Sequence, residues 1–270
     1  MSSDGLFSAF GYLTNALFFL AGIFVYVSLI RQISVRRSTS SDGSTKTFGL
    51  AEAIVAAILI SLLLLNVITS SSRPAIQLST RDLAANLVLT TVVVLILVGF
   101  LQLRGFDLDS LGGLSKIGIV RAVSTGAVLL FAAYPLIYLA DAITQRLLGS
   151  GSSRQNIVEL FNGSRTIEQR IMIIVLAVAV APLAEEFVFR FFLYGVLRRY
   201  FGRMLGLTFN ALLFAAVHAH LPSFAPLFVL GSCFTLAYEW SGSILVSMAM
   251  HSLFNSFTLI FLAFPELFQQ

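Results

Sequence analysis

Residues 171–197 read IMIIVLAVAVAPLAEEFVFRFFLYGVL, an apolar stretch interrupted near its middle by Glu185, Glu186 and Arg190. A helix needs about 20 apolar residues to cross about 30 Å of hydrocarbon, so the stretch is long enough to span a membrane. Ionisable groups at membrane depth cost free energy, and each needs a partner or a function. The stretch therefore predicts a membrane-spanning helix that carries a polar centre.

The composition of the whole chain agrees with this interpretation. Of the 270 residues, 57% are apolar and 11% are charged, and the mean hydropathy is +0.92. A soluble domain of this size could not bury so much apolar surface, so the bilayer must be the solvent. We expect an all-α fold, a polytopic transmembrane helical bundle of about eight spans. The chain should be an integral, multi-pass membrane protein, in the plasma or inner membrane if its source is bacterial.

The apolar stretches fall into two groups, which predict three regions. Residues 1–143 should hold four N-terminal transmembrane helices, 144–170 a polar connecting loop, and 171–270 a C-terminal catalytic core. We expect the ionisable residues inside spans to lie in the second group. The predicted spans are Phe7–Ile30, Phe48–Thr69, Leu83–Leu103, Ala122–Ala140, Ile171–Leu197, Met204–His218, Phe224–Tyr238 and Ile244–Phe264.

The distribution of basic residues predicts an orientation, because cytoplasmic loops carry an excess of Lys and Arg. The loops Ser34–Lys46 and Arg198–Arg203 hold dense basic clusters, so we expect both on the cytoplasmic side and both termini on the other side. The net charge of +4 is spread along the chain with no interleaved aromatic residues. This favours contact with lipid headgroups and gives no reason to expect a nucleic-acid partner.

The spacing within residues 185–190 separates two roles. Glu186 and Arg190 are four apart, on one helical face, where a carboxylate and a guanidinium can pair. Glu185 lies about 100° around the helix from Glu186 and must find another partner. We expect the Glu186–Arg190 pair to support the structure and Glu185 to be functional.

Candidate partners for Glu185 come from two later spans. His218 ends one span, and His251 and Asn255 share a face of the last span through their four-residue spacing. A pocket lined by one carboxylate, two imidazoles and a carboxamide suits hydrolysis of a peptide by an activated water molecule.

Three motifs in this order resemble those of the CPBP family, which groups CAAX prenyl endopeptidases with bacteriocin-processing and abortive-infection proteins. The family pattern is Glu-Glu-x-x-x-Arg, then Phe-x-x-x-His, then His-x-x-x-Asn/Asp. Here it is met by Glu185-Glu186 with Arg190, by Phe214 with His218, and by His251 with Asn255. The resemblance covers roughly Ile171 to Ala263, and one departure is Phe191, where many members have glycine.

The resemblance implies an intramembrane endopeptidase acting on a membrane-associated, prenylated or leader-peptide substrate. By matching position, it implies that Glu185 with His218 activates water and that His251 with Asn255 stabilises the oxyanion. Glu186, Arg190 and Phe214 would be structural support. No cofactor is expected.

Two alternatives remain open. Glu185, His218 and His251 could hold a zinc ion with an open fourth position, but this would leave no general base among the four residues, so the metal-free assignment is preferred. The polar core could also belong to a non-catalytic membrane scaffold or immunity factor, or to a transporter.

Overall fold

A computed structural model describes residues 3–39, 46–70, 80–148, 161, 163–164 and 166–264. All regular structure in this described part is helical, which confirms the all-α expectation. The elements are α1 (Ser3–Thr39), α2 (Leu50–Ser70), α3 (Thr80–Leu103), α4 (Leu108–Gly112), α5 (Ile119–Leu148), α7 (Ile167–Val175), η1 (Leu176–Val180), α8 (Ala181–Glu186), η2 (Phe187–Leu193), α9 (Tyr194–Val217), η3 (Leu221–Ser223), α10 (Phe224–Ser241) and α11 (Ile244–Ala263).

Seven helical stretches of the described chain are long and apolar enough to cross a membrane. The chain is therefore an integral, multi-pass membrane protein. Six of the stretches correspond one to one with predicted spans. The seventh, Ile167–Val217, contains both the fifth and the sixth predicted spans.

This long stretch reverses direction at Gly202. The φ angle of Gly202 is 77° and its ψ angle is 174°, values that no helix contains and that favour glycine because it lacks a Cβ. A Cβ added at Gly206 would lie 2.8 Å from the backbone nitrogen of Arg198. In a straight helix these two residues would be about 12 Å apart along the axis. Residues on either side of Gly202 therefore form a tight helical hairpin, which accounts for the eighth predicted span.

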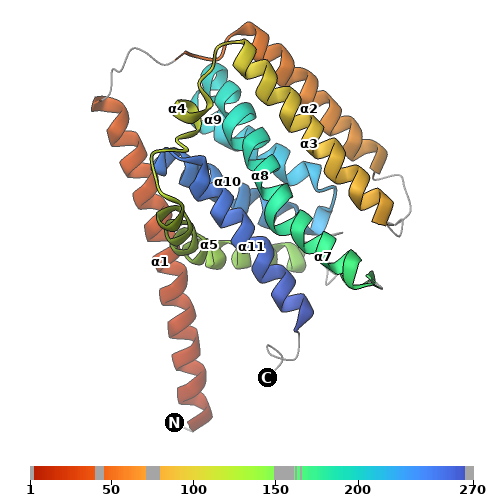
Figure 1. Ribbon diagram of the computed structural model, residues 1–270. Helices are drawn as coiled ribbons and strands as arrows, with labels where there is room; N and C mark the ends of the chain where they lie inside the picture. Colours follow the sequence, from red (N-terminus) through yellow and green to blue (C-terminus); the bar gives the residue numbers. More distant parts are fainter. Residues whose placement is uncertain are drawn as a thin grey trace.

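The helices are arranged around a central group (Figure 1). The helices from α7 to α11 lie together in the middle, with α1 on one side and the α2–α3 hairpin on the other. The start of α1 and the end of α11 lie at the same end of the bundle, as an even number of crossings requires. Helix α1 is attached to α5, where Tyr26 donates a hydrogen bond to the carbonyl of Leu129.

The base of the α2–α3 hairpin holds an ion pair that the sequence analysis did not anticipate. Glu52 is completely buried, and Nε of Arg104 lies 2.8 Å from its Oε1. The expectation that ionisable residues inside spans belong only to the C-terminal group is therefore wrong. Because Glu52 also accepts from the backbone N–H of Gly49, the charge is satisfied at the start of α2.

Several predicted boundaries differ from the observed ones because polar residues at helix ends continue the helix beyond the apolar stretch. Residues 34–39 were expected in a loop and are helical; 40–45 lie outside the described residues. Of the polar connecting loop, residues 144–148 and 167–170 are helical. Residues 149–160, 162 and 165 of that loop lie outside the described part. The division into three regions stays a prediction.

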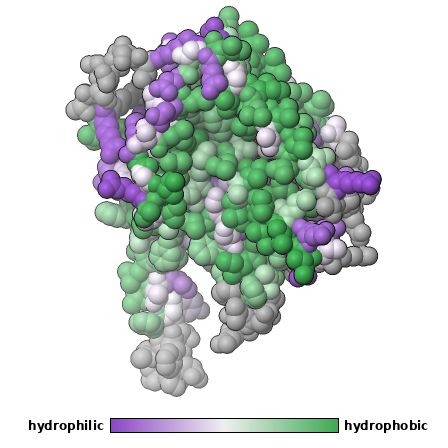
Figure 2. Space-filling model, in the orientation of Figure 1, coloured by the Kyte–Doolittle hydropathy of each residue, from purple (hydrophilic) through white to green (hydrophobic). Residues whose placement is uncertain are grey.

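The predicted cytoplasmic loops lie at the same end of the bundle. Arg203 donates to the carbonyl of Ile33, and Arg36 donates to the carbonyl of Trp240. Arg198 and Arg203 also pair with Glu239, an almost fully buried carboxylate that the sequence analysis missed. Figure 2 shows an apolar middle with hydrophilic side chains gathered toward the edges of the view. Which side of the membrane this end faces stays a prediction.

Candidate active site

The helix that carries Glu185 and Glu186 is irregular on both sides of them. Both η1 and η2 are π-helical, and short π segments often occur at functional sites. The N–H of Ala181 bonds to the carbonyl of Leu176, five residues back. In the same pattern, the carbonyl of Ala177 would accept a hydrogen bond from the backbone nitrogen of Pro182. Proline has no N–H, so that bond cannot form. Asn255 fills the gap by donating from Nδ2 to that carbonyl at 2.7 Å.

Glu186 and Arg190 form the ion pair that their spacing predicted. Nη1 of Arg190 lies 2.9 Å from Oε1 of Glu186, and neither side chain is exposed. The guanidinium also donates to the carbonyl of Gly231 on α10, at 3.3 Å. Its carbon atom Cζ lies 4.2 Å from the centre of the Phe214 ring, a cation–π contact.

His251 lies between the two glutamates. Its Nδ1 donates to Oε1 of Glu186 at 2.9 Å, and its Nε2 is 3.9 Å from Oε2 of Glu185. Since a carboxylate can only accept, Nδ1 must carry a proton, which leaves Nε2 facing Glu185. Glu186 therefore fixes both the orientation and the proton of the His251 ring.

The two neighbouring carboxylates differ in their access to the surroundings. The side chain of Glu185 is 32% exposed, whereas that of Glu186 is not exposed at all. Oε2 of Glu185 is buried and has no hydrogen-bond partner among the described residues. Glu185 is thus the carboxylate that combines a partly exposed side chain with an oxygen that has no hydrogen-bond partner among the described residues.

His218 lies at the C-terminal end of α9 and is oriented by the same type of contact. Its Nδ1 lies 2.7 Å from the carbonyl oxygen of Phe214. The carbonyl can only accept, so Nδ1 carries the proton, and the lone pair of the neutral ring is on Nε2. The Phe214 ring touches both imidazoles, with its centre 4.9 Å from that of His218 and 5.8 Å from that of His251.

The arrangement brings most of the predicted site residues together, with a different set of partners from the one expected. Glu185 lies beside His251, with 3.9 Å between Oε2 and Nε2, and the structure records no hydrogen bond between Glu185 and His218. Asn255 points one N–H at backbone, which leaves its second N–H and its oxygen for other contacts.

The zinc alternative concerns three of the same residues, Glu185, His218 and His251. Among the described residues, no group of three His, Cys, Asp or Glu side chains lies close enough together to hold a metal ion. Glu185, His218 and His251 do not form such a group in this arrangement, and the metal-free assignment stays a prediction.

Helix α10 supplies contacts that the sequence analysis missed. Gly231 provides the carbonyl for Arg190, and a Cβ there would lie 2.9 Å from the Phe214 ring. Phe234 stacks on His251 with ring centres 5.0 Å apart. A weak signal was present, because Gly231 and Phe234 lie three apart on one helical face. Nothing in their residue types distinguishes them from ordinary packing.

The departure at Phe191 has a local explanation. The ring of Phe191 stacks on Phe187, with centres 4.9 Å apart, and is 3% exposed. It lies against Gly112 of α4, where an added Cβ would be 3.5 Å from the ring. The larger side chain is therefore accommodated by a short helix outside the motif.

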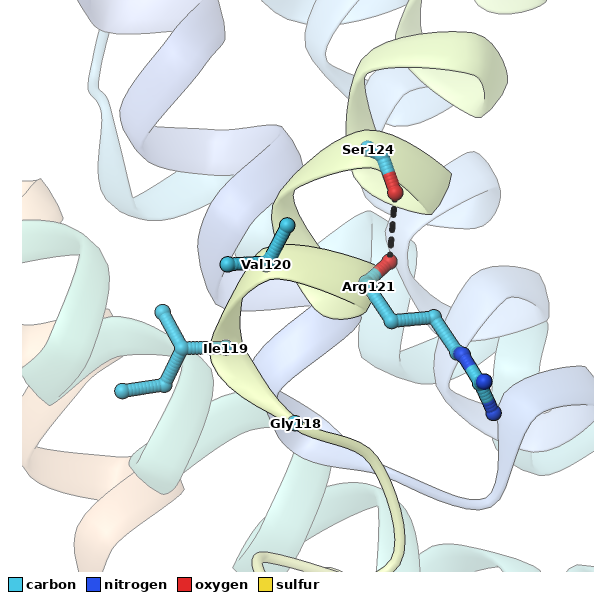
Figure 3. A pocket seen from close by; sticks show the side chains of 5 residues that line it. All are labelled: Gly118, Ile119, Val120, Arg121 and Ser124. Atoms are coloured by element: carbon cyan, nitrogen blue, oxygen red, sulfur yellow. Dashed lines mark hydrogen bonds between the residues drawn. The ribbon is translucent and has the colours of Figure 1, made fainter.

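Two cavities lie away from this cluster. The larger, about 690 Å³, is at the start of α5 and is lined by Gly118, Ile119, Val120, Arg121 and Ser124 (Figure 3). Ser124 there donates to the carbonyl of Arg121. The second, about 250 Å³, lies between α5, α10 and α11. The first has no carboxylate or imidazole, and the second has one carboxylate, Asp141, without a catalytic partner in its lining, so neither replaces the cluster around Glu185.

Comparison with known proteins matches the part of the chain that contains the predicted site residues. A model of the family described as Type II CAAX prenyl endopeptidase Rce1-like matches residues 167–257, which include every predicted site residue. Over 102 residues, the chain is 32% identical to the membrane-embedded CAAX protease MroQ of Staphylococcus aureus (strain USA300). The match covers 35% of this chain and 41% of that protein, so the chain spans about two fifths of the relative's length. No solved structure matches. The resemblance of the C-terminal part of this chain to the CPBP family of intramembrane endopeptidases, which the three motifs indicated, is therefore confirmed.

Proposed function

We propose that this protein is an intramembrane endopeptidase that hydrolyses a peptide bond with a water molecule activated by Glu185. The observation that carries the proposal is the environment of Glu185. Its buried Oε2 has no partner among the described residues and lies 3.9 Å from an imidazole that a second carboxylate holds in place. The similarity to a membrane-embedded CAAX protease supports the same function.

The first step requires two acceptors for one water molecule. Oε2 of Glu185 and Nε2 of His218 both have lone pairs that can accept its protons. As Glu185 takes a proton, the water oxygen attacks the carbonyl carbon of the scissile peptide bond. In the proposed substrate complex, Glu185 and His218 therefore bind the same water molecule.

The developing negative charge on the carbonyl oxygen then needs donors. Asn255 has a second N–H on Nδ2, and His251 can carry a proton on Nε2 while Glu186 holds Nδ1. When the carbon–nitrogen bond breaks, Glu185 returns its proton to the leaving amine. The products are a new carboxyl end and a new amino end, and Glu185 is ready for another cycle.

The substrate class follows from the location of the site. The cluster lies on membrane-spanning helices, so the proposed substrate is a membrane-associated peptide or protein, such as a prenylated protein or a leader peptide. The lipid bilayer is the second partner. The proposed chemistry uses no metal, and purified active protein should contain well under one equivalent of zinc and keep its activity in chelators.

A comparison of membrane proteomes tests the proposal. Cells that produce Glu185→Gln should accumulate uncut substrate that wild-type cells process. Glu168→Gln is the matched control, because Glu168 is an exposed glutamate on α7 outside the cluster. If Glu185→Gln and wild type process the same proteins equally, the peptidase function is wrong and the polar core serves a scaffold.

A further inference from the structure

A second set of hydrogen-bonded, buried polar groups lies next to the cluster around Glu185. It plays no part in the proposed steps of peptide hydrolysis. Nδ2 of Asn210, on α9, donates to Oγ1 of Thr235 on α10 at 3.3 Å. Thr235 in turn donates to the carbonyl of Gly231 at 2.9 Å. Both side chains are completely buried. Polar groups inside membrane helices are costly, so this pair requires a reason.

The carbonyl of Gly231 connects this set to the site. It accepts from Thr235 on one side and from Nη2 of Arg190 on the other. Arg190 then donates to Glu186, which accepts from His251. One continuous path of hydrogen bonds therefore runs from Asn210 on α9 to His251 on α11. The Gly231 carbonyl and Oε1 of Glu186 each accept from two donors, and these two shared acceptors join the separate hydrogen bonds into one path.

Arg190 depends on this carbonyl for its direction. Its Nε is buried without a hydrogen-bond partner among the described residues. Cζ of Arg190 lies 4.2 Å from the centre of the Phe214 ring and 5.1 Å from that of the Phe234 ring. These cation–π contacts do not fix the direction in which the N–H groups of the guanidinium point. The Gly231 carbonyl is the directional contact besides Glu186.

We propose that Asn210 and Thr235 are positioning residues for the peptidase site. They hold the Gly231 carbonyl in the direction of Arg190, and through Arg190 and Glu186 they set the orientation of the His251 ring. The kinetic consequence rests on the proposed function, whereas the effect on His251 does not.

A purely structural role for Thr235 is the competing explanation. Threonine and serine in helices commonly bond to the carbonyl four residues back. Ser232, on the same helix, does so to the carbonyl of Phe228 at 2.8 Å, but it takes no part in the path to Arg190. Ser232→Ala therefore removes an equivalent bond from α10 without touching the path and serves as the matched control.

The test uses two measurements on the full-length protein purified in detergent. The chain has three histidines, so labelling histidine with ¹⁵N gives few imidazole signals, and the signal of His251 is the one that a His251→Gln variant lacks. Thr235→Val keeps the shape of the side chain and removes the hydroxyl, and Thr235→Ser restores it. The second measurement, on the same samples, is turnover. Its substrate is one that the wild type cuts and that Glu185→Gln does not cut.

We expect the His251 signal to move in Thr235→Val, to return toward its wild-type position in Thr235→Ser, and to stay in place in Ser232→Ala. The kcat of Thr235→Val should fall by about 3- to 10-fold with KM little changed, the size typical of one neutral hydrogen bond. If Thr235→Val gives too little folded protein, Asn210→Leu, which leaves the hydroxyl in place, should move the signal in the same direction by less.

An unmoved His251 signal in Thr235→Val, or in Asn210→Leu where that variant takes its place, overturns the proposal whatever the turnover. So does an equal movement in Ser232→Ala, or a failure of Thr235→Ser to restore the signal. Absence of any Glu185-dependent turnover in the wild type would instead refute the peptidase function, and the imidazole signals would still decide the positioning role.

Discussion

The α2–α3 hairpin is more apolar than α10 and α11, and the two regions are surrounded by different material. In α2 and α3, 11% of the apolar span is buried within the protein, against 44% in the span that contains α10. Large side chains on the hairpin such as Leu62 and Ile96 are more than half exposed. Lipid replaces protein around them, so any apolar side chain of roughly suitable size satisfies the position. Around the site, the neighbours are protein groups of defined shape and charge, such as the Phe214 ring, the Arg190 guanidinium and the Gly231 carbonyl.

Two glutamate–arginine pairs, Glu186–Arg190 and Glu52–Arg104, give the largest expected contrast between these regions. Arg190→Ala strands the unexposed Glu186 and should cost about 3–5 kcal/mol of stability, as for buried pairs in general. Arg104→Ala should cost much less, because Arg104 is 46% exposed and Glu52 keeps its bond from Gly49. Folded yield and thermal unfolding in detergent measure both.

The double variant Glu186→Gln with Arg190→Met sharpens this result. It removes both charges, so it should recover much of the yield lost in Arg190→Ala while remaining inactive. If Arg190→Ala were fully stable and inactive, Arg190 would be a substrate-binding or catalytic group, and its support role would be refuted.

Two helix glycines provide the next contrast. Gly231→Ala would place a Cβ 2.9 Å from the Phe214 ring and 3.4 Å from Arg190, so it should destabilise by about 1–3 kcal/mol through overpacking. Gly99→Ala, in α3, meets nothing within 4 Å and should be neutral or stabilise by up to about 1 kcal/mol. Thermal unfolding distinguishes them, and equal effects would show that α10 can move away from Phe214.

These contrasts also explain what the sequence could predict. Spans and the Glu186–Arg190 pair follow from hydropathy and from four-residue spacing, which act within one helix. The fifth and sixth spans were separated correctly because Arg198–Arg203 interrupts the apolar pattern, although the reversal itself depends on the backbone of Gly202. Helix ends were less predictable, since polar residues such as those at 34–39 continue α1 beyond its apolar part.

The pairing between helices could not be predicted in the same way. Spacing placed His251 and Asn255 on one face but could not say that His251 would contact Glu186, or that Asn255 would fill the gap left at Ala177. Gly231 contributes a backbone carbonyl, which no side-chain pattern encodes. Glu52 and Glu239 were missed because each lies near a helix end, where a charge would ordinarily reach water.

The smallest contrast concerns loss of one methyl group. Ile244→Val, at the buried start of α11, should cost about 0.5–1.5 kcal/mol. Ile96→Val, on the lipid-facing side of α3, should change stability by less than about 0.5 kcal/mol. A large loss in Ile96→Val would mean that the exposed face of the hairpin packs against protein.

The most direct test of the account is turnover by Glu185→Gln beside that of wild type, at equal amounts of purified folded protein, on a substrate identified from the proteomes. Glutamine keeps the shape of the side chain and removes the base, so cleavage should fall by roughly 10²–10⁴-fold. Folded yield should hardly change, because Glu185 has no ion-pair partner as close as that of Glu186. Undiminished cleavage by Glu185→Gln would contradict the assignment of Glu185 as the group that activates water.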